Sequence, residues 1–249
     1  MSVVESFRQH VTSVEKLMNF DRDVLEFAVS SLRELKTKLT RHHKLDNPEL
    51  TAERTLQILE GIREHDSLRP RYQTIFNQAL VLLVSYFGSS VHDMFRRGIT
   101  EALAHDSDSQ LLREQVHLSL RDLRDANFEL RDLAPDLLVQ AKDISFQDMQ
   151  SIARVFRDYL DVNIDKSEVV NDIILGQACR HVIVHSGGMV DERLIRQISG
   201  AKPRRVKFSL IPGERVQFSD QEVMLVSDSM VQYLQSVAGK VAGRYGVEV

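Results

Sequence analysis

The sequence predicts a mainly α-helical protein, a helical bundle with a small β-hairpin before its C-terminal helix. Apolar residues recur at three- and four-residue steps through most of the 249 residues, which is the period of an amphipathic helix. Period-two alternation occurs around one Pro-Gly turn, within residues 206–218, and indicates the hairpin. A hydrophobic content of 43% and a charged content of 27% are typical of a globular chain that buries a core.

The N-terminal part reads as helix with one apolar face over residues 3–41, as one long helix or two. Asn47-Pro48 ends this pattern, and a short second helix follows from Thr51 to Gly61. We place a boundary near residue 66. Residues 1–66 are then an N-terminal helical arm, and residues 67–249 form the main helical domain.

Residues 72–103 carry the strongest helical pattern and predict a core helix. A polar turn follows, and residues 111–133 combine leucines with many arginines and aspartates. We interpret this stretch as an amphipathic hairpin arm or insertion covering about residues 105–140. Its paired charges, such as Arg121 with Asp125, are typical of a solvated face.

Two helices follow the insertion. Residues 145–161 predict one, with Ser145 as its N-cap. Residues 172–185 predict the next, which is apolar on more than one face. Gly187 or Gly188 should end it, because glycine accepts the left-handed conformation found at helix ends.

The C-terminal part begins with a short helix over residues 189–198 and continues into the hairpin of residues 206–218. Ser219 and Glu222 have the spacing of a capping box. This pair should open the last helix, from residue 223 to about residue 241.

Composition excludes several classes. The longest apolar run, residues 79–87, is far shorter than the roughly 20 residues of a membrane-spanning helix, and the first 20 residues carry acids where a secretory signal is apolar. We therefore expect a cytoplasmic protein without a membrane partner. The single Cys179 excludes an intramolecular disulfide framework and favours a buried thiol.

The most informative segment is residues 177–188, where an arginine, two histidines and an apolar spacer precede a glycine pair. Composition alone gives about one Arg-x4-His pair by chance, so the surrounding sequence has to support any functional interpretation. His185 should lie in the last turn of its helix. The helix dipole favours a cation there, and a histidine can exchange a proton near neutral pH.

These residues resemble the HEPN superfamily, whose nucleases carry an arginine, a polar residue, a few apolar residues and a histidine near the end of a core helix. The corresponding positions are Arg180, His181, residues 182–184 and His185. The resemblance covers about residue 68 to the C-terminus, including a turn after the motif like that of RiboL-PSP-type members. His181 departs from the asparagine that many members have.

The resemblance implies a metal-independent endoribonuclease that acts as a homodimer, with two motif helices meeting across a twofold axis. It also implies a toxin or defence effector, with RNA as substrate and an antitoxin or defence-system component as partner. Arg180 would stabilise the phosphorane, and His185 would be the general acid or base. The alternative is a non-catalytic HEPN module that binds a nucleotide or a protein partner.

Helix geometry indicates that the second copy implied by the resemblance would help this chemistry. Arg180 and His185 lie about 7.5 Å apart along the axis and about 140° apart around it, so one copy does not present both to one phosphate. His181 shares a face with His185, and could orient it, bind phosphate, or do neither. A metal site formed by His181, His185 and Asp191 is a weaker hypothesis than metal-independent chemistry, because no glutamate separates the histidines. We expect no metal and no cofactor.

Further candidate residues surround the motif. Asp93 lies in a polar interruption of the core helix and either pairs with Arg180 or faces solvent. The net charge of −4 argues against binding RNA by bulk attraction, so cationic contacts must be local. The candidates for substrate binding, which could equally be solvated charges, are Arg96, Lys202, Arg204 and Arg205.

Overall fold

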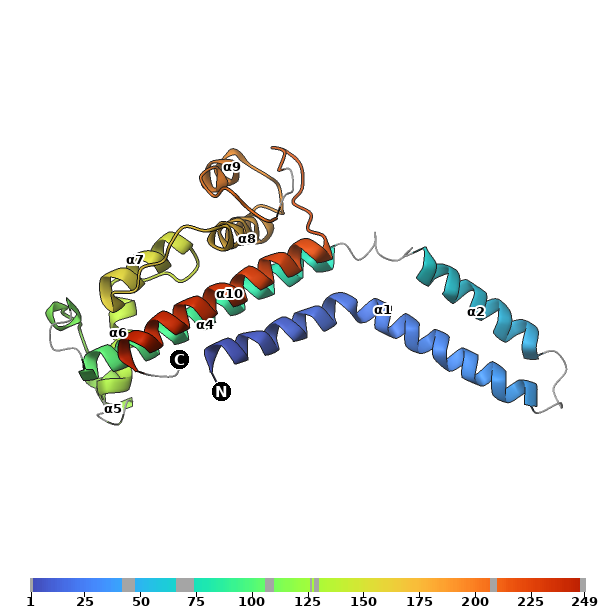
Figure 1. Cartoon of the computed structure of the whole chain (residues 1–249), viewed down its shortest axis with the longest axis horizontal. Coiled ribbons are helices and arrows are strands. Elements are labelled where there is room, and N and C mark those ends of the chain that lie inside the picture. Colours follow the sequence, from blue (N-terminus) through green and yellow to red (C-terminus); the bar gives the residue numbers. More distant parts are fainter. Residues whose placement is uncertain are drawn as a thin grey trace.

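The computed structural model describes residues 2–41, 48–65, 74–105, 110–125, 127, 130–206 and 210–246. The described chain is mainly helical, as predicted (Figure 1). In chain order the elements are α1 (Val3–Arg41), α2 (Pro48–Glu64), α4 (Thr74–His105), the 3₁₀-helix η1 (Gln110–Arg113), α5 (Leu120–Asp125), α6 (Leu130–Ala141), α7 (Met149–Leu160), α8 (Glu168–His185), α9 (Glu192–Ile198) and α10 (Asp220–Tyr245).

The core lies around α4 and α10, which run side by side (Figure 1). The first half of α1 packs on one side of this pair and α8 packs on the other. Phe87 of α4 joins three helices, because its ring contacts Phe7 of α1 at 6.2 Å and Tyr233 of α10 at 5.5 Å between centroids. By length and composition α4 could cross a membrane, but thirteen of its residues are buried, as in the core helix of a bundle.

The N-terminal segment divides differently from the predicted arm of residues 1–66. Phe7, Val14 and Met18 of α1 are buried in the core, so the first half of α1 belongs to the bundle. Only its second half projects, paired with α2 (Figure 1). α2 also continues through Gly61, where we expected it to end. The predicted boundary near residue 66 lies outside the described residues.

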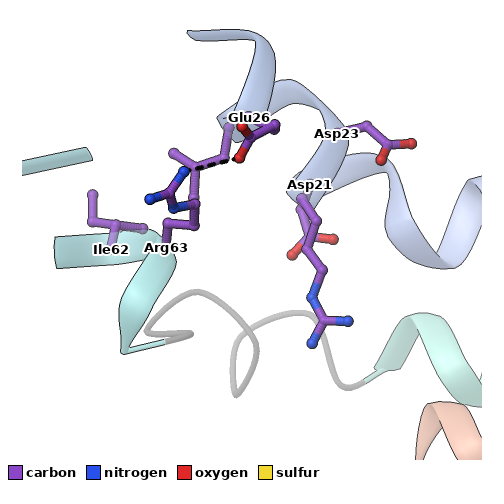
Figure 2. A pocket seen from close by; sticks show the side chains of 7 residues that line it. Asp21, Asp23, Glu26, Ile62 and Arg63 are labelled. Atoms are coloured by element: carbon purple, nitrogen blue, oxygen red, sulfur yellow. Dashed lines mark hydrogen bonds and ion pairs between the residues drawn. The ribbon is translucent and has the colours of Figure 1, made fainter. Parts of the chain in front are cut away.

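Ion pairs hold α2 against the projecting half of α1. Figure 2 shows Arg63 of α2 reaching Glu26 of α1, with 3.0 Å between Nη1 and Oε2. The cavity beside this pair is also lined by Asp21 and Asp23. Because these charges are largely exposed, each pair adds little stability, roughly 0–1 kcal/mol.

The predicted insertion consists of short elements instead of one amphipathic arm over residues 111–133. η1 and α5 are followed by α6, which packs on α4 through the buried side chains of Leu137 and Leu138. Arg124, rather than Arg121, forms an ion pair with Asp125.

The predicted β-hairpin is not found in the described part of residues 206–218, and residues 207–209 lie outside that part. Residues 213–216 pair instead with the turn after α8. Val190 N donates to Glu214 O at 2.8 Å, and Val216 N donates to Gly188 O at 2.8 Å. Backbone groups that the hairpin would have satisfied locally are thus satisfied by a distant segment.

Of the predicted helix starts, that of α7 is wrong and that of α10 is confirmed. α7 begins at Met149, because the Asp148 carboxylate accepts a hydrogen bond from Ser151 N at 2.7 Å. Ser145 is therefore not its cap, and residues 144–148 are not helical. The capping box of Ser219 and Glu222 is present at the start of α10, which runs further than predicted, to Tyr245.

Candidate functional site

α8 carries the motif and ends where the glycine pair predicts. Ser167 caps its first turn by accepting a hydrogen bond from Val170 N at 3.3 Å. At the other end, Gly187 and Gly188 adopt φ values of +59° and +78°, and Gly188 N donates to Val182 O at 3.0 Å. His185 is in the last helical turn, as expected from the sequence.

The C-terminal end of α8 is the part that reaches solvent. Most of the helix is buried, as its all-round apolar pattern predicts. In the last two turns His181 and His185 are exposed, Arg180 is half-buried, and Val184 is 46% exposed. Four motif residues thus form one open surface at the end of a core helix.

Arg180 lies at the edge of this surface, beside a groove of about 470 Å³ between α4 and residues 144–147. Its Nη1 donates a hydrogen bond to Oε1 of Gln147 at 3.2 Å. The carbonyl oxygen of Phe146 would lie only 3.3 Å from a β-carbon at position 88, so Gly88 allows this close approach to α4. Gln147 contributes a neutral amide, and among the described residues no carboxylate pairs with Arg180.

Sequence reasoning missed Gln147 because it assigned residues 145–148 to a helix. The signal that could have found the true start is Asp148, an N-cap residue directly before Met149 and Ile152, which are buried. With that cap recognised, Gln147 belongs to a connecting segment that can face α8.

Of the two alternatives for Asp93, pairing with Arg180 or facing solvent, the structure agrees with the second. Asp93 is exposed, and in the described part of the chain its carboxylate makes no ion pair with Arg180. His92, one residue earlier, lines the groove instead. The groove-facing positions Ser85, Ser89 and His92 follow three- and four-residue steps, and Asp93 lies to one side of them, about 100° around the helix from His92.

Arg96 extends the same face of α4 but already has an acidic partner. Its Nε lies 2.9 Å from Oδ1 of Asp136 on α6, and Nε2 of His92 lies 3.8 Å from the same oxygen. The His92 ring also stacks on Phe146, with 4.9 Å between centroids. Arg96 is therefore anchored at one end of the groove by α6.

The two histidines form a pair on the other edge of the surface. The ring centroids of His181 and His185 are 4.8 Å apart. Partial burial lowers the pKa of His181, the neighbouring His185, Arg193 and Arg180 lower it further, and Asp191 opposes them. Asp191 itself caps α9 by accepting a hydrogen bond from Leu194 N at 2.7 Å. No cluster of three potential metal ligands occurs among the residues that the structure describes.

Arg205 has a structural position that contradicts its predicted role in substrate binding. Its Nε donates to Oδ2 of the fully buried Asp172 at 3.0 Å, and Ser229 Oγ donates to the same oxygen at 3.0 Å. Asp172 precedes Arg180 by eight residues, about 12 Å along the helix axis. This network ties the loop of residues 201–206 to the bundle, away from the motif.

The other cations of this loop differ from Arg205. Lys202 is exposed, whereas Arg204 is half-buried. The charge of Arg204 acts on Cys179, but burial dominates and raises the pKa of this thiol to about 12. Cys179 is buried in the core, and its position lies about 160° around α8 from the exposed His181.

Within one copy, Arg180 borders the α4 groove, while His181 and His185 form the opposite edge of the exposed surface. Comparison of the chain with protein-family models, with curated proteins and with solved structures found no match. The chemistry of this surface and the resemblance of its motif are therefore the grounds for a functional proposal.

Proposed function

We propose that the protein is a metal-independent endoribonuclease of HEPN type, acting in the cytoplasm as a homodimeric toxin or defence effector. The observation that carries this proposal is the open end of α8. An otherwise buried helix presents Arg180, His181 and His185 to solvent around the exposed Val184.

A second copy completes the site. Val184 lies between the arginine and the histidines, so two such faces that meet across a twofold axis bury their valines together. Isologous pairing of this kind is the commonest form of oligomer. It brings Arg180 of one protomer towards His185 of its partner, which the helical spacing prevents within one chain.

The residues suit cleavage by the 2′-hydroxyl of the substrate. The 2′-oxygen attacks the adjacent phosphorus while one His185 takes its proton, and the 5′-oxygen leaves with a proton from the second His185. Arg180 stabilises the charge on the phosphorane through its bidentate fork. The products are a 2′,3′-cyclic phosphate and a 5′-hydroxyl, and no metal is consumed or required.

The test is an RNase assay of the purified protein on total RNA and tRNA with a chelator present. We expect cleavage, a loss of about 10²–10³-fold in rate for Arg180→Ala, and a loss of about 10²–10⁴-fold for His185→Ala. Arg157→Ala, an exposed arginine whose side chain pairs with Asp158, is the matched control and should keep full activity.

A substrate with a 2′-deoxyribose at the cut site should not be cleaved. Activity that survives Arg180→Ala, or that requires a divalent metal, would contradict the proposal. A requirement for a divalent metal would favour a metal site at His181 and His185 instead.

A second candidate function, a module that binds a protein partner, is favoured by α1. The face of α1 turned away from the core carries large apolar side chains that are 42–75% exposed: Leu17, Phe20, Val24, Phe27 and Leu35. A contiguous patch of this kind marks interaction sites. Asp21 and Asp23 flank this stripe by their positions on the helix, four residues after Leu17 and three after Phe20. The partner that fits is therefore an amphipathic helix with Lys or Arg beside its apolar seam.

Crosslinking in the host cell, followed by mass spectrometry, tests this second function. It predicts crosslinks from the α1 stripe to such a basic helix, and their loss in a Phe20→Ser, Phe27→Ser variant. RNA cleavage by the unmodified protein would show that partner binding is not its whole function.

A further inference from the structure

A second groove lies beside the motif, in addition to the groove that borders Arg180. It has a volume of about 300 Å³ and lies between the start of α4 and the turn after α8, where Gln78, Arg215 and Gln217 meet Ile183. Ile183 follows Arg180 by about one helical turn, so neighbouring positions on one edge of α8 line the two grooves.

One face of α4 forms the floor of both grooves. Thr74 and Gln78 line the second groove, and Ser85, Ser89 and His92 line the first. Their steps of three, four or seven residues place them on a single helical face. From Thr74 to His92 this face runs for about 27 Å, a length that suits about four nucleotides of single strand. We call this combined surface the α4 track.

The charge of the α4 track differs from that of the whole chain. Acids make up 36 of the 249 residues, so about three would be expected among nineteen. Yet none of the nineteen described residues lining the two grooves is acidic, and Arg180 and Arg215 are among them. The cavities elsewhere do contain acids, such as Asp21 beside α2 (Figure 2) and Asp165 beside α10. The lining of the α4 track therefore suits an anionic strand better than the acid-containing cavities do.

The remaining side chains of the track suit unpaired bases. Ser89, Gln147 and Gln78 offer hydroxyl and amide groups that can bond to base edges. His92, stacked on Phe146, provides a ring surface at one end.

We propose that the α4 track binds single-stranded RNA on both sides of the phosphate held by Arg180. This inference rests on the proposed ribonuclease function and adds to it a substrate class, single-stranded RNA, and the residues that hold its flanks. The strand runs from Gln78 and Arg215, past Arg180, towards His92.

The first experiment measures binding without cleavage. Full-length protein carrying His185→Ala is titrated against a labelled ten-nucleotide RNA, and against the same sequence as a duplex, by fluorescence anisotropy. Adding Ser89→Glu or Gln78→Glu should weaken single-strand binding at least tenfold. Ser31→Glu, the matched change on exposed α1, should alter it less than twofold. Arg215→Gln should reduce the slope of log affinity against log salt by about 0.7.

The second experiment uses the active protein and separates this inference from the ribonuclease proposal. Ser89→Glu should raise KM for single-stranded RNA more than it lowers kcat. If RNA is cleaved but KM is unchanged in Ser89→Glu and Gln78→Glu, the proposal that the α4 track binds RNA is wrong, whereas the ribonuclease proposal is not contradicted. If single strands bind in a track-dependent way but are never cut, the nuclease is wrong. Equal affinity for duplex, or no binding of single strands, overturns the track.

Discussion

At the scale of single residues, the amide that holds Arg180 decides how the guanidinium can be used. Gln147 accepts a hydrogen bond from it without adding a negative charge. A carboxylate in the same place would form an ion pair with Arg180 and compete with the phosphate of the substrate. Gln147 is thus a positioning residue in the proposed reaction.

We therefore expect Gln147→Glu to lower RNA cleavage by at least tenfold, mainly through KM, at an unchanged melting temperature. Gln147→Met, of similar length and no charge, should have a smaller effect on KM. Cleavage kinetics on a defined oligonucleotide test both variants. Equal activity of Gln147→Glu and the unmodified protein would mean that Arg180 does not hold phosphate from its present position.

His181 provides a prediction about pH. Because its pKa is lowered in the folded protein, the folded state binds fewer protons than the unfolded state below about pH 6.5. The contribution of His181 to stability is therefore complete above pH 6.5 and is lost as the pH falls through its folded pKa.

An NMR titration of the histidine ring signals should place the midpoint of His181 below 6.5. His185→Asn and Arg193→Gln should each move that midpoint upwards, since each removes a charge that opposes protonation. A midpoint at or above 6.5 in the unmodified protein would contradict this account.

At the scale of elements, the buried Asp172 connects α8, α10 and the loop of residues 201–206. Besides Arg205 and Ser229, Val206 N donates to its Oδ1 at 3.2 Å. A carboxylate that is fully buried is tolerated only with such partners, and removing one partner leaves a charge without compensation. The network fixes the loop to the helices that position the motif.

Arg205→Ala should lower the free energy of unfolding by about 3 kcal/mol, at the lower end of the effects of breaking buried pairs because its side chain is 29% exposed. Lys202→Ala, in the same loop but exposed, should change it by less than about 0.5 kcal/mol. Urea denaturation measures both. Similar midpoints for the two variants would show that the pair contributes no net stability.

At the scale of the whole molecule, the proposed site belongs to two chains. Homodimers of Arg180→Ala lack both arginines and homodimers of His185→Ala lack both histidines, whereas a mixed dimer of the two keeps one Arg180 facing the partner's His185 and lacks only the second His185 and the second Arg180. Mixing the purified variants after partial unfolding and refolding should therefore restore part of the activity, whereas neither variant refolded alone should recover it.

Val184→Glu should give monomers in sedimentation experiments and abolish cleavage, because it places charges in the shared contact.

The position of α1 also depends on the whole molecule. Its periodic pattern predicts a helix but not its neighbours, and we assigned all of it to a separate arm. Phe7 and Met18 pack in the core only because α4 and α10 lie side by side and leave a face for them. The same helix then leaves the bundle and pairs with α2. A sequence pattern cannot show where along a continuous helix this change occurs.

The helices and their ends were determined by the sequence alone where the controlling interactions are local. The Gly187-Gly188 turn and the Ser219 and Glu222 capping box each depend on residues within one or two turns. The tertiary structure alone decided that Arg180 donates a hydrogen bond to Gln147, that Arg205 pairs with Asp172, and that the backbone of Val216 pairs with that of Gly188. These contacts join residues about 30 positions apart, and side-chain type and spacing carry no information about which distant group will satisfy a given charge or backbone group.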